Sequence, residues 1–198
     1  MIVRGVIFQK TKTNMRFVFA LTIGKSFLHD SLRVQFQQKQ KLGQLLRRTV
    51  HVHQVPRYDR LVVEMHAVLG RFGRLDGDLA TFYAAQLVDV LAHLHTQDVA
   101  FRDVKPENAL LDEKGYLRLA DFGLARKVDG DDGRCRTRCG TPLYAAPEVI
   151  SGRSHGRPVD AWALGCVIVE MRTGRPPFVG STVSQVEALV LEADLGWL

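Results

Sequence analysis

Apolar residues recur along the rear two thirds of the chain with helical spacing. Between Asp78 and Thr96 they fall at i, i+3 and i+4, which predicts an amphipathic helix with Asp76 or Asp78 as its N-cap. Val159–Thr173 is almost continuously apolar, which indicates a second, buried helix. Gly174 stands where a helix C-cap is expected, and two prolines follow it.

The front of the chain has a different pattern. Val3–Phe8 and Arg16–Ile23 are rich in β-branched and aromatic residues and predict a hairpin, and Arg60–Met65 predicts a further strand. Leu32–Arg48 predicts a helix with a weak apolar stripe, and Thr182–Ala193 predicts the last helix. Strands therefore dominate the front and helices the rear.

This order of elements predicts an α+β fold with two lobes. We expect residues 1–65 to form a small, β-rich N-terminal lobe and residues 66–198 a mostly helical C-terminal lobe, joined near Met65. With 198 residues, of which 46% are hydrophobic and 24% charged, the chain can bury one sizeable core and is typical of a globular protein.

Charge is unevenly distributed along the chain. Residues 1–60 hold 12 Lys/Arg and 2 Asp/Glu, a net of +10, whereas residues 61–198 carry a net of −4. A basic front end can contact nucleic acid, and salt-dependent binding by residues 1–60 would show it. Because no aromatic residues interleave with these charges as a base-stacking surface requires, a solvated face is favoured and no nucleic-acid partner is expected.

Cysteine content and apolar runs bear on the compartment. The three cysteines, Cys135, Cys139 and Cys166, are too few for a disulfide framework and suit a reducing environment. The start of the chain lacks a signal-peptide pattern, and no run approaches the ~20 apolar residues of a membrane helix. The sequence therefore predicts an intracellular, cytoplasmic protein without a transmembrane segment.

A charged loop carries the first candidate chemistry. In Phe101–Asn108, three residues follow the spacing D-x-K-x-x-N of a kinase catalytic loop: Asp103, Lys105 and Asn108. Phosphoryl transfer needs a group to orient the attacking hydroxyl, cations on the phosphates and oxygen ligands for Mg²⁺. Asp103 would accept the hydroxyl proton, Lys105 would neutralise phosphate charge and Asn108 would bind Mg²⁺. A merely solvated, charged surface loop is the alternative for this stretch alone.

Three further motifs follow in order. Asp121-Phe122-Gly123 comes after an apolar segment, Tyr116–Leu119, that predicts a strand, so Asp121 is placed to hold Mg²⁺ against phosphate oxygens. Ala146-Pro147-Glu148 ends the segment that begins at Asp121, and Asp160 lies at the start of the buried helix. Four motifs in this order and spacing make coincidence negligible.

The segment Arg102–Phe178 resembles the AGC group of serine/threonine protein kinases, and within it the cyclic-nucleotide-dependent kinases. A weaker resemblance extends back to about Phe17. The stretches that carry it are Phe82–Gln86, Lys105–Asn108, Cys139–Tyr144, Val159–Gly165 and Arg175–Phe178. The resemblance implies a protein-kinase-like two-lobe fold, ATP and Mg²⁺ as cofactors, and protein substrates with basic residues near the target Ser or Thr.

The resemblance also implies roles for individual residues at the reaction centre. Thr141 would bond Asp103 and Lys105, and Asp160 would hold the backbone of the catalytic loop. Asn108 and Asp121 would bind the metal. The nucleotide would further contact Ala20, Glu64 and Leu110.

Regulation and substrate choice are implied in the same way. Thr137 stands where the group carries its activating phosphate, with Arg102 and Arg126 as cationic partners, while a third partner position holds Phe36. An upstream activating kinase and a regulatory subunit are the partners this implies. The acidic residues that would favour basic substrates are Glu107 and Glu170. Thr137 could instead be an ordinary loop threonine, and the two glutamates solvated carboxylates.

The front of the chain departs from the family where ATP is held. No Gly-x-Gly-x-x-Gly precedes the first hairpin, Thr22 stands at the position of the strand lysine, with Lys25 three residues on, and Gln40 stands at that of its glutamate partner. About six residues are missing between the hinge (Glu64-Met65) and Gly73 when the motif positions are compared with those of the family.

The rear departs as well, since the family's later helices are absent and the domain looks truncated at both ends. We expect Glu148 to lack its buried partner and Phe178, Leu189, Leu191 and Trp197 to face water. The sequence therefore predicts a serine/threonine kinase domain with weak or no activity as it stands. The alternative is a pseudokinase, a partner-binding module with a degraded ATP site, and the sequence alone does not separate truncation from decay.

Overall fold

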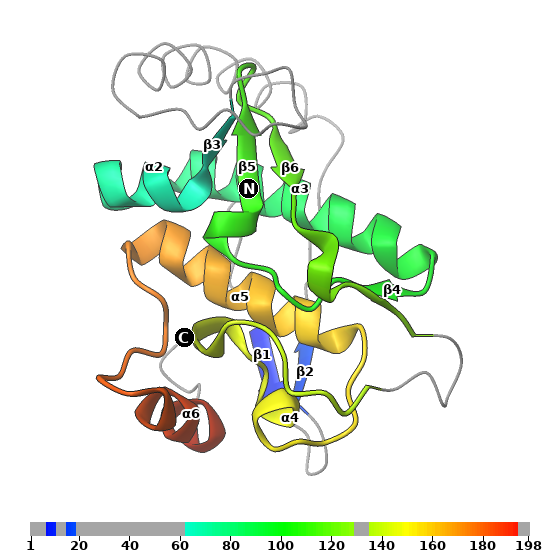
Figure 1. The fold of residues 1–198 in the computed structure, drawn as a ribbon. Helices are drawn as coiled ribbons and strands as arrows, with labels where there is room; N and C mark the ends of the chain where they lie inside the picture. The colour runs from blue at the N-terminus through cyan, green and yellow to red at the C-terminus, as the bar shows by residue number, and fades with distance from the viewer. Residues whose placement is uncertain (1–6, 11–14, 19–61, 129–134, 194–198) are drawn as a thin grey trace.

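The computed structural model describes residues 7–10, 15–18, 62–128 and 135–193 (Figure 1). The predicted helix Leu32–Arg48 lies outside these residues. Within them, three small antiparallel sheets and five α-helices occur. The proposed division into lobes of residues 1–65 and 66–198 stays a prediction.

Two of the three sheets are isolated strand pairs. Strand β1 (Ile7–Lys10) pairs with β2 (Met15–Val18), which confirms the hairpin, and neither strand pairs with any other described strand. Strand β4 (Val99–Ala100), directly before the catalytic loop, pairs with β7 (Arg126–Lys127).

The third sheet brings the predicted hinge to the end of the catalytic loop. Its order is β3 (Val62–Glu64), β5 (Ala109–Asp112) and β6 (Leu117–Leu119). The strand predicted at Arg60–Met65 ends one residue early, because Met65 is the first residue of α2 (Met65–Phe72) and is fully buried. The chain therefore turns directly from strand into helix at this point.

The two long helices form the layer on which the sheet rests. Helix α3 (Gly77–Thr96) begins at Asp76, whose carboxylate accepts a hydrogen bond from the Leu79 amide at 2.8 Å, so Asp76 and not Asp78 is the cap. Helix α5 (Pro158–Thr173) packs on α3 and ends at Gly174, whose φ of 80° requires the left-handed region. Figure 1 shows β5 and β6 in front of α3, with α5 crossing below them.

The burial of helix α5 explains why its sequence has no polar face. It is buried on most of its circumference, and the core residues it contributes are Val159, Trp162, Ala163, Leu164, Cys166, Val167 and Met171. A helix that is apolar all round is typical of the centre of a domain. The core continues through Tyr83, Leu87 and Leu91 of α3 and Phe101 and Val104 of the catalytic loop.

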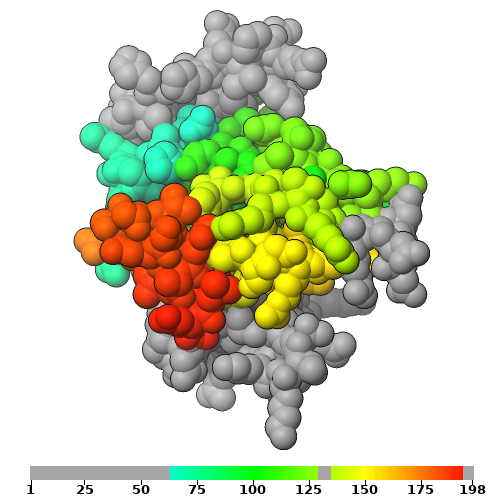
Figure 2. All heavy atoms as spheres, turned by 60° about the horizontal axis from the view of Figure 1, so that its bottom comes forward, coloured from blue at the N-terminus to red at the C-terminus, as the bar shows by residue number. Residues whose placement is uncertain are grey.

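The rear of the domain ends in two shorter helices. Helix α4 (Pro147–Ile150) is a single turn, and α6 (Val183–Glu192) begins at Thr182, whose hydroxyl accepts a hydrogen bond from the Gln185 amide. Figure 2 shows α6 beside the segment of residues 135–150, and α6 contacts α4.

One expectation for this region is wrong: Phe178 is buried, because its ring stacks on Trp162 of α5 with centroids 5.8 Å apart. Glu148 has no ion-pair partner among the described residues, as expected, but it is partly exposed, so its charge is not fully buried. Leu189 and Leu191 are exposed, as expected. Trp197 lies outside the described residues. Among the described helices, none is long and apolar enough to span a membrane.

Candidate active site

The catalytic loop lies between β4 and β5 and buries its own acid. Asp103 is 8% exposed, and its Oδ2 lies 2.8 Å from Nζ of Lys105. Lys105 keeps about a fifth of its side chain exposed, so its ammonium group faces the surface of the loop. The loop thus presents one carboxylate with a cation beside it, as the spacing predicted.

Thr141 joins this pair from the segment between Asp121 and Glu148, hereafter the activation segment, 38 residues after Asp103. Its hydroxyl donates to Oδ1 of Asp103 at 3.2 Å and accepts from Nζ of Lys105 at 3.1 Å. Each carboxylate oxygen of Asp103 therefore has a partner of its own. This is the contact that the resemblance implied for Thr141.

Asn108 fixes Asp103 from the other side. Its Nδ2 donates both to the main-chain oxygen of Asp103 at 2.8 Å and to Oδ2 at 3.0 Å, and the side chain is 6% exposed. The short 3₁₀ turn Pro106–Asn108 brings the amide back toward the acid. Since the nitrogen end of the amide is used, its oxygen is the atom left to ligate a cation.

The backbone before Asp103 is held in an unusual conformation. Arg102 has a φ of 67°, in the left-handed region that non-glycine residues rarely adopt. Asp160, fully buried at the start of α5, accepts the Phe101 amide at 2.9 Å and the Arg102 amide at 2.7 Å. Its Oδ2 also lies 2.7 Å from Nε2 of His95.

His95 was missed by the sequence reasoning. It lies in the last turn of α3, on the turn that leads directly into β4 and the catalytic loop. A titratable residue in the last turn of a helix, next to that loop, is the signal that could have indicated it. The structure makes it the third group on Asp160.

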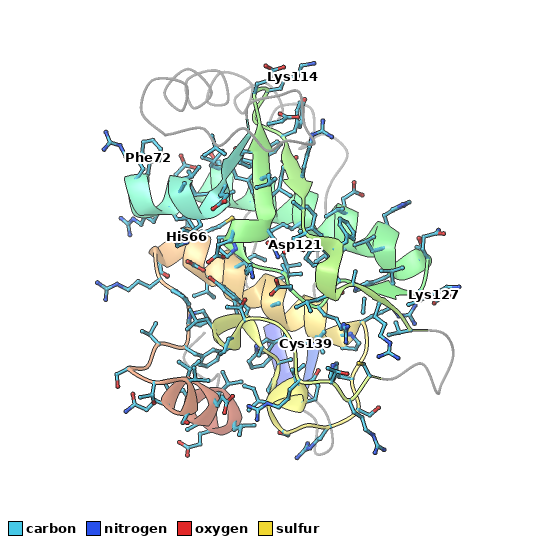
Figure 3. The ribbon with its side chains drawn as sticks, viewed as in Figure 1. His66, Phe72, Lys114, Asp121, Lys127 and Cys139 are labelled. Carbon is cyan, nitrogen blue, oxygen red and sulfur yellow. The ribbon has the colours of Figure 1, made fainter. Side chains whose placement is uncertain are left out.

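Asp121 presents its carboxylate at the surface. Its φ is 59°, and its Oδ1 accepts the Gly123 amide at 3.1 Å, an arrangement that holds the side chain at the start of the 3₁₀ turn Phe122–Leu124. Phe122 packs its ring edge-on against Phe101 at 5.1 Å. Figure 3 shows Asp121 between β6 and the segment that carries Cys139.

The predicted nucleotide contacts are only partly within the described residues. Glu64 and Leu110 are direct neighbours across β3 and β5, both half-buried, so the structure brings these two together. Ala20, Thr22 and Gln40 lie outside the described residues. No cluster of three or more His, Cys, Asp or Glu occurs among those described, so a metal here would depend on phosphate oxygens besides Asn108 and Asp121.

The two glutamates predicted for substrate choice lie near each other. Burial raises the pKa of Glu170, the hydrogen bond from Tyr144 opposes this, and the charge of Glu107 raises it further. Tyr144 donates to Oε2 of Glu170 at 2.7 Å. Oε2 of Glu107 is buried and has no hydrogen-bond partner in the described part of the chain, while its Oε1 lies 3.9 Å from His66.

Two of the residues predicted for regulation, Arg102 and Arg126, meet at a cysteine. Thr137 is exposed, whereas Arg102 and Arg126 both direct a guanidinium nitrogen at the sulfur of Cys135, at 2.8 and 3.4 Å. The sequence reasoning gave Cys135 no role. The sequence around Cys135 does not indicate that two arginines distant in the chain will contact this residue.

Taken together, these contacts define a class of protein. A buried aspartate is paired with a lysine and oriented by a threonine and an asparagine, with an exposed aspartate before a Phe-Gly turn, between a small sheet and a helical layer. That combination is typical of a phosphoryl-transfer domain. The family model of the protein kinase domain matches residues 47–194, about three quarters of the chain, and the chain belongs to the protein kinase family.

Its relatives are serine/threonine kinases of the AGC type. The chain is 46% identical over 132 residues to "Protein kinase 2" of Dictyostelium discoideum, a match that covers 67% of this chain and 27% of that protein. It is 47% identical over 115 residues to the cAMP-dependent protein kinase catalytic subunit PRKX of Mus musculus, covering 58% and 32%. It is 39% identical over 134 residues to the cAMP-dependent protein kinase catalytic subunit 3 of Drosophila melanogaster, covering 68% and 22%.

These matches confirm the resemblance and the α+β kinase fold. By family the chain is a protein serine/threonine kinase domain, and domains of this family use ATP and Mg²⁺ on protein substrates. The matched part spans less than a third of the length of these three relatives.

Proposed function

We propose that this chain is the catalytic core of a kinase that transfers the γ-phosphoryl group of ATP to Ser or Thr in basic protein segments. The observation that carries the proposal is the orientation of Asp103 by three side chains from two segments: Lys105 and Asn108 of the catalytic loop and Thr141 of the activation segment. Asp103 accepts the hydroxyl proton of the substrate, and Lys105 neutralises the charge that develops on the transferred group.

The oxygen atoms near Asp103 suit a hard cation. Mg²⁺ prefers carboxylate, amide and phosphate oxygens, and the amide oxygen of Asn108 and the carboxylate of Asp121 supply two of these. When bound, ATP would supply the phosphoryl group, and Mg²⁺ would supply the positive charge that neutralises the phosphate oxygens. Glu64 and Leu110, adjacent across two strands, are proposed to contact the nucleotide from the sheet side.

Glu107 and Glu170 are proposed to select basic substrates. A buried carboxylate oxygen without a partner, as on Glu107, is unfavourable unless a ligand completes it. Glu170 lies close enough for the charge of Glu107 to raise the pKa of Glu170, so the two carboxylates place negative potential in the same region. An arginine side chain of the substrate would satisfy both groups with charge-assisted hydrogen bonds. Thr137, which is exposed, is proposed as a site for an upstream activating kinase.

A transfer assay with labelled Mg-ATP and an Arg-rich Ser/Thr peptide tests the catalytic proposal. We expect phosphopeptide to form, more slowly than with a full-length relative, and Asp103→Asn to reduce its formation by at least about 10²-fold. An Arg-to-Ala peptide is the matched substrate control. Turnover that is equal in the Asp103→Asn variant would show that phosphate transfer comes from elsewhere.

A partner-binding module without turnover is the second candidate, favoured by Thr22 and Gln40 at the positions of the family's ion pair. Thermal unfolding with and without Mg-ATP separates the two. A shift that depends on Asp121 supports a working nucleotide site, and no shift together with no turnover supports the binding module.

A further inference from the structure

The sulfur of Cys135 lies in a pocket made by two arginines. Arg102 comes from the catalytic loop and Arg126 from β7, and their Nη1 atoms lie 2.8 and 3.4 Å from Sγ. Cys135 is 2% exposed, whereas Arg102 is half-buried and Arg126 is exposed, so a buried sulfur meets two guanidinium groups that reach it from the edge of the surface. A neutral thiol is a weak acceptor, whereas a thiolate is the natural partner of two guanidinium groups.

The backbone holds the sulfur in place. Cys135 and His155 exchange both main-chain hydrogen bonds, at 2.8 and 2.9 Å, in a short antiparallel bridge between the activation segment and the loop before α5. His155 has its Nδ1 3.0 Å from the main-chain oxygen of Arg153, so the ring is engaged on its own loop. The position of Cys135 is therefore fixed by the backbone, and its side chain is presented to the arginines.

The groups around the sulfur favour a negative charge. Burial alone would raise the pKa of Cys135, but hydrogen bonds from Thr137 and the charges of Arg102 and Arg126 lower it to about 7. Cys139, on the same segment, has its pKa raised by burial, and burial raises the pKa of Cys166 to about 12. Of the three cysteines, Cys135 alone has surroundings that support a thiolate near neutral pH.

We propose that the Cys135 thiolate is the resident anion of the Arg102–Arg126 pocket and anchors the activation segment to the catalytic loop when Thr137 carries no phosphate. Arg102 precedes Asp103 directly, and Thr141, six residues after Cys135, bonds the same aspartate. A charge bound at this pocket therefore ties together the two segments that orient Asp103. This makes Cys135 a positioning residue. A regulatory role for it rests on the proposed kinase function, whereas the presence of a thiolate at this position does not depend on that function.

The first experiment measures the thiolate directly. The ultraviolet absorbance of thiolates is followed from about pH 5 to about pH 10 in the wild-type chain and in Cys135→Ser, and the difference titrates one residue. We expect a midpoint near 7, and a midpoint near 8.5, the value of an ordinary thiol, would overturn the proposal.

Matched arginine variants test the pocket. Arg126→Ala should move the midpoint upward by about one pH unit, since it removes one of the two cations on the sulfur. Arg136→Ala is the control: Arg136 adjoins Cys135 and is exposed, and its loss removes the same charge away from the described hydrogen bonds of the sulfur. Equal midpoints in the two variants would overturn the assignment.

The second experiment asks whether the thiolate holds the structure. A folded pKa below that of the unfolded thiol contributes stability that is complete above the unfolded value and is lost as pH falls through about 7. The melting temperature of the wild type relative to Cys135→Ser should therefore rise between pH 7 and about 9. Parallel curves would contradict the anchoring role, and Cys135→Asp should retain the anchor at lower pH.

A third comparison tests the link with Thr137. If a phosphate shares the arginine pocket, Thr137→Glu should raise the Cys135 midpoint further than Thr137→Val, which removes only the hydroxyl. Equal midpoints would overturn the shared pocket. None of these readouts needs turnover, so a chain without kinase activity still decides the proposal.

Discussion

Asp103 owes its orientation to a hydroxyl group from another part of the chain. Thr141 contacts both Asp103 and Lys105, at 3.2 and 3.1 Å, and thereby connects the activation segment to both of them. A hydroxyl donates to one and accepts from the other through a single oxygen atom, whereas an amide needs two separate atoms for this and an apolar group can do neither.

Replacing Thr141 with Val should therefore lower kcat by about tenfold, the equivalent of one lost hydrogen bond at the acid, with little change in KM for ATP. Steady-state kinetics on the basic peptide measure this. Thr141→Ser keeps the hydroxyl and should stay within about twofold of the wild type. A Ser variant as slow as the Val variant would mean that the methyl group, and not the hydroxyl, matters.

Glu170 is a buried acid that lies near a second carboxylate, that of Glu107. Because burial and Glu107 raise its pKa, Glu170 favours the protonated form more in the folded chain than in the unfolded chain. Its contribution to stability is present at acid pH and is lost as pH rises through the raised pKa. An arginine from a substrate would reverse this by favouring the charged form.

Glu170→Gln should thus stabilise the chain at neutral pH while raising KM for an Arg-containing peptide by roughly tenfold or more. The amide oxygen can still accept from Tyr144, so the core contact is kept. Thermal unfolding and peptide kinetics on the same preparation check both effects. Unchanged KM with raised stability would leave Glu170 a structural residue only.

At the scale of elements, the activation segment lies close against the catalytic loop at Gly140. Its φ is 91°, and a Cβ placed there would lie 2.8 Å from the main-chain oxygen of Arg102. Arg102 is itself in the left-handed region, so its carbonyl has little freedom to move away. The two segments can lie this close only because one of them lacks a side chain.

Gly140→Ala should therefore destabilise the fold by more than the roughly 1 kcal/mol that a positive φ alone costs, and should reduce activity with it. Gly152→Ala is the matched control, with a φ of 65° and nothing within 4 Å of the added Cβ. Urea unfolding of both variants measures the difference. Equal losses would show that the close approach to Arg102 relaxes without cost.

At the scale of the whole molecule, Asp160 links three parts of the chain. Its carboxylate joins α5 to the catalytic loop through two amides, and to the end of α3 through His95. The side chain is fully buried, so any partner it loses stays away from water. Loss of one oxygen acceptor here would leave at least one amide unsatisfied and release the strained backbone at Arg102.

Asp160→Asn should lower the free energy of unfolding by about 3 kcal/mol and abolish measurable turnover. Asp98→Asn is the comparison, since the Asp98–Arg157 pair at 2.9 Å is about half exposed and an exposed pair contributes less than about 1 kcal/mol. Denaturant unfolding distinguishes them. A loss of similar size in both variants would mean that the buried carboxylate has no special role.

Much of the helical part of this fold could be predicted from the sequence. Helices α3 and α5 follow from long apolar patterns, and the ends at Asp76 and Gly174 follow from cap chemistry. These signals are local, so they persist without knowledge of what packs where. The wrong expectation at Phe178 concerned burial, which depends on a partner 16 residues away, Trp162.

Site residues that belong to a sequence motif could be predicted, whereas residues that come together only in the folded chain could not. Asp103, Lys105 and Thr141 were expected together because the family resemblance links their motifs, and the structure confirms the contacts. His95 and Cys135 belong to no such pattern. Each reaches its partner only through the three-dimensional path of the loop beside it.

The stacking of Trp162 on Phe178 also gives the chain an internal fluorescent reporter. The sequence holds two tryptophans, and Trp162 is 3% exposed on the helix whose first turn carries Asp160. With Trp197 replaced by Phe, all remaining indole emission would come from the N-terminal part of α5. A blue-shifted spectrum that moves to longer wavelength in urea would then follow the loosening of this helix from its neighbours, separately from any signal at the surface.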